Sequence, residues 1–126
     1  MNEYYVKLFK EVLFNCEVLS EKVMDYNKEH DKNDEYETAN KMRNDFANLH
    51  DRMEDPAYVP TKNDYIVILA ATYITAQNLE DHAATLEKVA KGYRMEVIPR
   101  LTRIIDETQD DEGAKELAEK IFQLNN

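Results

Sequence analysis

Tryptophan is absent from this chain of 126 residues, and cysteine, glycine and proline are scarce, with one, two and three copies. A lone cysteine cannot form an internal disulfide, so we expect packing to stabilise the fold in a reducing compartment, by default the cytoplasm. Two separate glycines leave no glycine-rich loop for binding phosphate groups. The scarcity of helix-breaking residues favours long helices.

The sequence also lacks a long apolar segment and a basic leader. Its most apolar run, residues 65–74, is about half of the ~20 residues that a membrane-spanning helix needs. The first residues do not lead from a basic patch into an apolar stretch, so a signal peptide is not expected. These features predict a protein that neither crosses nor enters a membrane.

The chain has fewer basic than acidic side chains, 16 against 26, and its formal charge is −10. Such a charge repels the phosphates of nucleic acids and of anionic membranes, so direct binding to either is disfavoured. One region reverses the balance, because residues 88–103 hold five basic side chains and a single acid. The basic side chains of this segment, here called the basic strip, are Lys88, Lys91, Arg94, Arg100 and Arg103.

Apolar side chains recur at helical spacing through most of the chain, which predicts an all-α fold. The first helix is expected over residues 3–29, where two parallel seven-residue series form one apolar seam. Its members are Tyr5, Val12, Leu19 and Tyr26, with Phe9, Cys16 and Val23 beside them. A second helix is expected from Asp34, capped with Glu37, to Met53.

The third helix is expected to begin at Thr61, capped with Asp64, after a loop that contains two prolines. Its apolar spacing continues to Ala90. A break or kink in the third or fourth helix is then predicted between Gly92 and Pro99, because glycine ends helices and proline disrupts their interior.

Three acids, Asp110, Asp111 and Glu112, are expected to open a last short helix that continues through Leu124. Residues 1–126 are therefore predicted to form a single domain, an up-and-down bundle of four to five helices.

Neither a catalytic nor a cofactor site is apparent in the sequence. Each of the three histidines, His30, His50 and His82, lacks the glutamate three residues earlier that di-iron bundles require. His82 is instead expected in the core or at its boundary, hydrogen-bonded locally. Carboxylate pairs such as Asp34 with Glu37, and Glu116 with Glu119, leave a metal-dependent helical hydrolase as an alternative. Capping and solvation explain these pairs better, so we expect no enzyme, metal or cofactor.

The leading hypothesis is a non-enzymatic module or regulator that binds another protein. Tyr4 and Tyr58 are the tyrosines expected to be exposed, and tyrosine and arginine are common at interfaces. A sharper version is that the acidic surface imitates nucleic acid and blocks the partner's binding groove, as small inhibitors from phages and mobile elements do. The acids expected to contribute include Asp31, Asp34, Glu35 and Glu37.

Two alternatives remain open at this stage. The basic strip can pair internally with neighbouring acidic helices while the tyrosines cover the boundary of the bundle. The chain can also be a structural subunit of a homo-oligomer, in which the apolar seam faces another copy.

Overall fold

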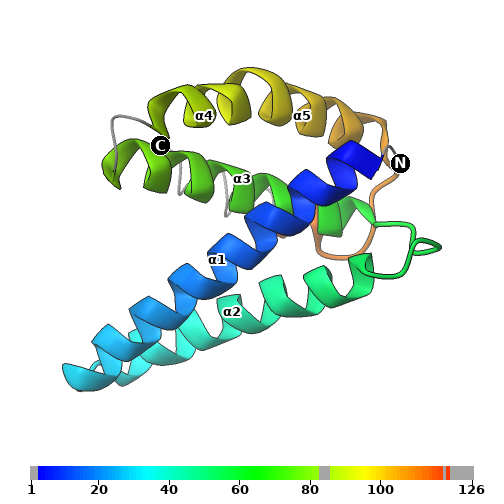
Figure 1. The fold of residues 1–126 in the computed structure, drawn as a ribbon. Coiled ribbons are helices and arrows are strands. Elements are labelled where there is room, and N and C mark those ends of the chain that lie inside the picture. The colour runs from blue at the N-terminus through cyan, green and yellow to red at the C-terminus, as the bar shows by residue number, and fades with distance from the viewer. Residues whose placement is uncertain (1–2, 83–85, 118, 120–126) are drawn as a thin grey trace. The chain divides into compact units, whose positions relative to one another are not determined.

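The computed structural model describes residues 3–82, 86–117 and 119, and every regular element among them is helical. The all-α bundle prediction is confirmed. The chain divides into two compact units, Met1–Tyr58 and Val59–Asn126, while the prediction of a single domain stays a prediction. The elements in chain order (Figure 1) are α1 (Glu3–Glu29), α2 (Asn33–Met53), α3 (Lys62–His82), α4 (Glu87–Gly92), η2 (Tyr93–Val97) and α5 (Ile98–Glu107).

The first unit is a hairpin of two long helices, α1 and α2, which lie side by side and run in opposite directions (Figure 1). The first helix has the predicted bounds. Ion pairs cross between the helices, with Lys10 Nζ 3.0 Å from a carboxylate oxygen of Glu54 and Arg43 3.7 Å from Glu21. These pairs are partly exposed, so apolar packing contributes more than they do to the stability of the hairpin.

The apolar seam of α1 is buried in its first half only. Phe9, Val12 and Cys16 are buried as predicted, whereas Val23 and Tyr26 are 49% and 53% exposed. The buried side chains in the second half are polar, namely Ser20 and Asn27. The Ser20 hydroxyl donates a hydrogen bond to the carbonyl of Cys16, which removes the main cost of burying it.

The second helix begins without the predicted capping pair. Its N-cap is Lys32, which makes no side-chain cap hydrogen bond, and the carbonyl of Asp34 accepts a bond from the Thr38 hydroxyl. The predicted pairing of Asp34 with Glu37 at the helix start is therefore wrong. The side of α2 that faces inward is apolar, since its buried residues are Ala39, Phe46, Leu49 and Met53.

The second unit begins with the predicted capping box. The Thr61 hydroxyl accepts a hydrogen bond from the Asp64 N–H at 3.1 Å, and the Asp64 carboxylate accepts one from the Thr61 N–H at 3.0 Å. Each side chain thus satisfies a backbone donor that the first turn of a helix leaves without a partner. The predicted end of this helix was wrong, because α3 ends at His82 rather than near Ala90.

The predicted break between Gly92 and Pro99 takes the form of a widened turn. Gly92 is the last residue of α4, but its helical dihedral angles, φ −59° and ψ −44°, carry the helical path into the next element without a left-handed turn. The π-helical segment η2 follows, and α5 begins at Ile98 with Pro99 in its first turn. Proline lacks an N–H and clashes with the carbonyl four residues earlier in an α-helix, which explains why the turn widens immediately before Pro99.

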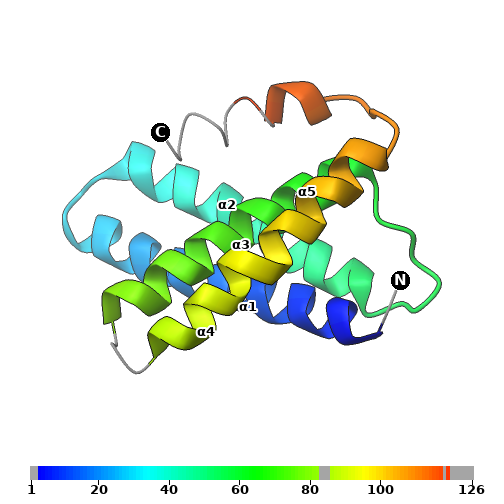
Figure 2. The ribbon, with the colours of Figure 1, turned by 90° about the horizontal axis from the view of Figure 1, so that it is seen from above.

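The helical path α4–η2–α5 packs along α3, and the two lie side by side in both views (Figures 1 and 2). The buried side chains on this path include Ala90, Val97, Ile98 and Leu101. A second apolar cluster joins α3 to the segment after α5, through the contact of Ile66 with Ala114.

Two acids after α5 contact the first turn of α3, and they also precede the last helical segment. The Asp111 carboxylate accepts a hydrogen bond from the Asn63 N–H, and Asp110 lies 2.7 Å from Lys62 Nζ. Within the described residues, helical geometry resumes at 114, later than the predicted start. The predicted continuation to Leu124 lies outside the described residues.

Candidate functional site

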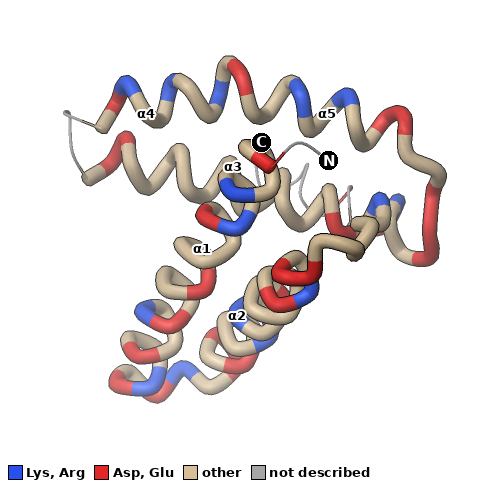
Figure 3. The backbone as a smooth tube through the Cα atoms, turned by 45° about the vertical axis from the view of Figure 1, so that its right-hand side comes forward, with Lys and Arg blue, Asp and Glu red and all other residues tan. Residues whose placement is uncertain are grey.

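Acidic residues gather where α1 joins α2 (Figure 3). Residues 25–37, here called the acidic end, carry six acids and two lysines, a net charge of −4. All six carboxylate side chains are exposed, and they are Asp25, Glu29, Asp31, Asp34, Glu35 and Glu37. The structure thus brings together the four predicted acidic site residues on the connected ends of two helices.

The acidic end is held by a defined backbone turn. The Lys32 N–H donates to the Asn27 carbonyl at 2.9 Å, and the Asp31 N–H donates to the Lys28 carbonyl at 3.4 Å. Asp31 has a positive φ of 56°, so these bonds form a Schellman motif with aspartate where glycine is usual. The turn therefore presents its carboxylates from a specific geometry rather than from a loose loop.

Apolar surface accompanies the acids. The exposed Tyr26 ring stacks on the His30 imidazole with 4.1 Å between ring centroids, and Lys32 Nζ lies 5.6 Å from the Tyr26 centroid. Val23 is exposed one turn earlier on α1. Exposed aromatic and aliphatic groups among charges are typical of protein interfaces. The sequence interpretation missed Val23 and Tyr26 as surface residues because it assigned both to the buried seam.

The two tyrosines predicted to be exposed differ. Tyr4 is 61% exposed, which confirms that prediction, and its ring packs edge-on against Tyr5. Tyr58 is only half-buried rather than exposed, and the Arg52 guanidinium lies 5.9 Å from its ring centroid. A cation over an aromatic face covers part of the ring, so the prediction for Tyr58 was wrong.

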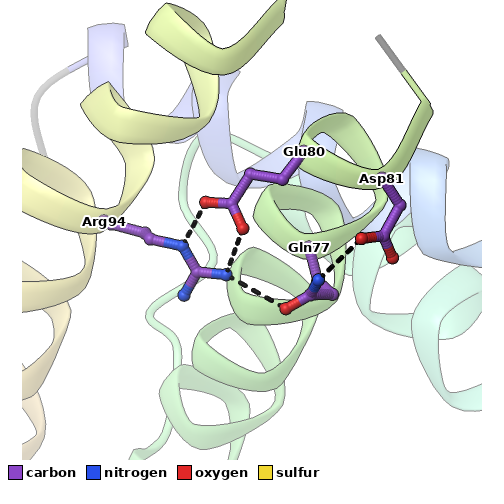
Figure 4. Close-up of polar contacts among 4 residues, drawn as sticks. All are labelled: Gln77, Glu80, Asp81 and Arg94. Atoms are coloured by element: carbon purple, nitrogen blue, oxygen red, sulfur yellow. Dashed lines mark hydrogen bonds and ion pairs between the residues drawn. The ribbon is translucent and has the colours of Figure 1, made fainter. Parts of the chain in front are cut away.

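One member of the basic strip pairs internally. Arg94 donates two hydrogen bonds to the Glu80 carboxylate, at 2.6 and 3.0 Å, and one to the Gln77 amide oxygen (Figure 4). Gln77 in turn donates to Asp81. The hydrogen bonds from Arg94 hold the pKa of the Glu80 carboxyl below its ordinary value. This bidentate contact fastens η2 to α3.

The other basic residues of the strip, Lys88, Lys91, Arg100 and Arg103, are exposed. Within residues 86–117, no ion pair engages Lys88, Lys91 or Arg103. Exposed apolar side chains also lie on the α4–η2–α5 path, where Val89 is 49% and Met95 65% exposed. Figure 3 shows where the charged residues fall along the same path. The strip is therefore a mixed basic and apolar surface from which Arg94 is removed by its pairing.

The histidines and carboxylates form no recognisable metal centre in the described part of the chain. No group of three or more His, Cys, Asp or Glu residues there is close enough to hold a metal ion. His82 is exposed rather than in the core or at its boundary, although its local bond to the Asn78 carbonyl, at 2.9 Å, agrees with the prediction. His50 lies 3.8 Å from Glu54 and packs against Phe14.

Comparison of the chain with protein-family models, curated proteins and solved structures finds no match. Among the helices that the structure describes, none combines the length and the apolar character needed to cross a bilayer. The two charged surfaces are therefore the features from which a function can be inferred.

Proposed function

We propose that this protein is a non-enzymatic regulator that places the acidic end of its α1–α2 hairpin on a basic surface of another protein. The observation that carries the proposal is the arrangement of six exposed carboxylates around a hydrogen-bonded turn and on the helix ends that it joins. Tyr26 and Val23 add apolar contact area beside them. Charges steer the two proteins together and set their orientation, while the apolar groups contribute to affinity.

The partner class that best fits this surface is a protein with a groove for nucleic acid. Double-stranded DNA carries one negative charge per ~1.7 Å of its axis, so a basic groove built for phosphates also attracts a dense set of carboxylates. The acidic end supplies six acids within thirteen residues. The regulator would act by competing with nucleic acid for that groove.

The proposal is tested by capturing partners from cells of the source organism with the tagged chain. The test variant neutralises four acids of the acidic end, by Glu29→Gln, Asp34→Asn, Glu35→Gln and Glu37→Gln. A control variant makes the same charge change at exposed acids elsewhere, by Glu3→Gln, Glu11→Gln, Asp106→Asn and Glu107→Gln. Duplex DNA is added as a competitor, and salt is raised from about 0.1 M to about 1 M.

We expect one partner to be retained by the wild type and the control and to be lost by the acidic-end variant. High salt and duplex DNA should both release it, because each screens or replaces the carboxylates. Equal capture by all three chains, or capture that ignores both salt and DNA, would refute the proposal.

A further inference from the structure

We infer that the basic strip is a docking surface for the acidic end of a second copy of this chain. The inference rests on the proposed function in one respect, since the same acidic end is the docking element. It adds a surface on the α4–η2–α5 path and names its occupant. The two surfaces lie in different units of the chain, and each is argued from its own exposed residues.

Charge complementarity identifies the occupant. With Arg94 engaged by Glu80, the strip keeps the exposed Lys88, Lys91 and Arg103 against the single acid Glu96, a net charge of +2. The acidic end carries −4. Opposite potentials of this size attract over about 8 Å at physiological ionic strength. The rest of the chain is acidic on balance, so the strip is the part of a second molecule that suits the acidic end.

The apolar groups of the two surfaces also correspond. Val89 and Met95 are exposed on the path that carries the strip, and Val23 and Tyr26 are exposed beside the acidic end. Positions 88 and 103 are fifteen steps apart along the helical path, a length of about 22 Å. The end of a helix pair, whose axes lie about 8–10 Å apart, fits within that length. Docking would bury these apolar side chains and bring the opposite charges together.

This contact uses two different patches, so it is heterologous. Each molecule that docks still offers its own strip or its own acidic end to a further copy, and association continues into chains or closes as a ring. A copy whose acidic end is occupied in this way cannot use it on a partner. Self-association therefore stores the regulator in an inactive form that dilution or a competing basic surface releases.

The test is sedimentation of the purified full chain over a wide concentration range, at about 10 mM and about 1 M salt, where the screening length is roughly 30 Å and roughly 3 Å. One variant reverses the strip by Lys88→Glu, Lys91→Glu and Arg103→Glu. A second reverses the acidic end by Glu29→Lys, Asp34→Lys and Glu35→Lys. A matched control reverses exposed lysines elsewhere by Lys7→Glu, Lys41→Glu and Lys115→Glu.

We expect about a twofold or larger rise in the weight-average mass of the wild type and the control at low salt, and monomers at high salt. Each reversed variant alone should stay monomeric, because its two surfaces then carry the same sign. An equimolar mixture of the two reversed variants should regain the association. The acidic end of the strip-reversed variant can bind the basic strip of the other variant, and the reversed, basic end of that variant can bind the reversed, acidic strip. Circular dichroism verifies that each variant keeps its helices.

A wild type that is monomeric at every concentration at low salt, or a mixture that fails to associate, overturns the inference. The outcome is separable from that of the proposed function. The strip-reversed variant keeps an intact acidic end, so it should still capture the partner protein. Capture without self-association removes only the inference, and self-association without a capture difference removes only the proposed function.

Discussion

The two glycines of the chain should respond in opposite directions when each is replaced by alanine. Gly92 has helical dihedral angles and no heavy atom within 4 Å of the position where a Cβ would lie. Gly113 has the same open surroundings but a φ of +86°. Space is therefore equal at the two sites, and only the backbone conformation distinguishes them.

Replacing Gly92 by alanine should raise the free energy of unfolding by about 0.5–1 kcal/mol, because alanine loses less backbone entropy in a helix than glycine does. Replacing Gly113 by alanine should lower it by about 1–2 kcal/mol, since an L-residue is strained at a positive φ. For a chain of 126 residues, a change of 1 kcal/mol corresponds to a shift of about 4 °C in Tm.

Differential scanning calorimetry and urea titration of both variants measure these shifts. The two compact units can unfold in separate transitions, so the shift should be looked for in each transition. A lower stability for the Gly92→Ala variant would indicate that the helical path terminates at Gly92, one of the outcomes that the sequence left open, and would refute a continuous path from α4 into η2. A higher stability for Gly113→Ala would refute the claim that the positive φ of Gly113 strains any residue other than glycine.

Four substitutions at three further positions test other local features. Asp31→Gly should raise the stability of the first unit by up to ~1 kcal/mol in urea titration, because glycine adopts the positive φ of 56° without strain. Asp31→Val should lower that stability. Equal stabilities of the two variants would contradict the Schellman geometry. Thr61→Ala should cost about 1 kcal/mol in the same assay by removing the acceptor of the Asp64 N–H, and no loss would mean that the capping box does not contribute. Glu80→Gln should lower Tm at neutral pH. The pKa of Glu80 is below its ordinary value in the folded chain, so the stabilisation from Arg94 is present above that ordinary value and is lost as the pH falls through the lowered pKa. Melting curves of the two proteins should therefore converge in acid, and a constant difference down to the lowest pH would contradict this assignment.

Local signals in the sequence predicted the elements whose ends are set locally. The bounds of α1 follow from the extent of its apolar series, and the start of α3 after Thr61 and the loop before it follow from capping residues and prolines close by. The end of α3 was missed because apolar residues at helical spacing continue past His82 into the next helix. Periodicity shows that two segments are helical, but it does not show where the chain turns between them.

The exposed half of the α1 seam has a different cause. A seven-residue pattern identifies the residues that share a face, while exposure depends on whether another element covers that face. In the second half of α1 the buried residues are Ser20 and Asn27. A search for regularly spaced apolar residues does not identify them, because both are polar. The pairing of Arg94 with Glu80 was also beyond the sequence, since it joins residues fourteen positions apart on two elements.

The acidic end was predicted more completely than the basic strip. Asp31, Asp34, Glu35 and Glu37 lie close in the chain, so any turn between two helices would bring them together. The strip extends over several helical turns, and the sequence does not show which of its residues form ion pairs within the chain. Arg94 pairs with Glu80 because η2 places it against α3.

Cys16 is buried, with 1% exposure, so the reactivity of its thiol can report local unfolding of the chain. A thiol-specific reagent reaches this sulfur only when the surrounding part of α1 opens, so the rate of labelling follows the population of opened molecules. Since the chain has no other thiol, every event of labelling is assigned without engineering. Adding a captured partner to such an experiment would show directly whether occupation of the distant turn slows the opening of the hairpin.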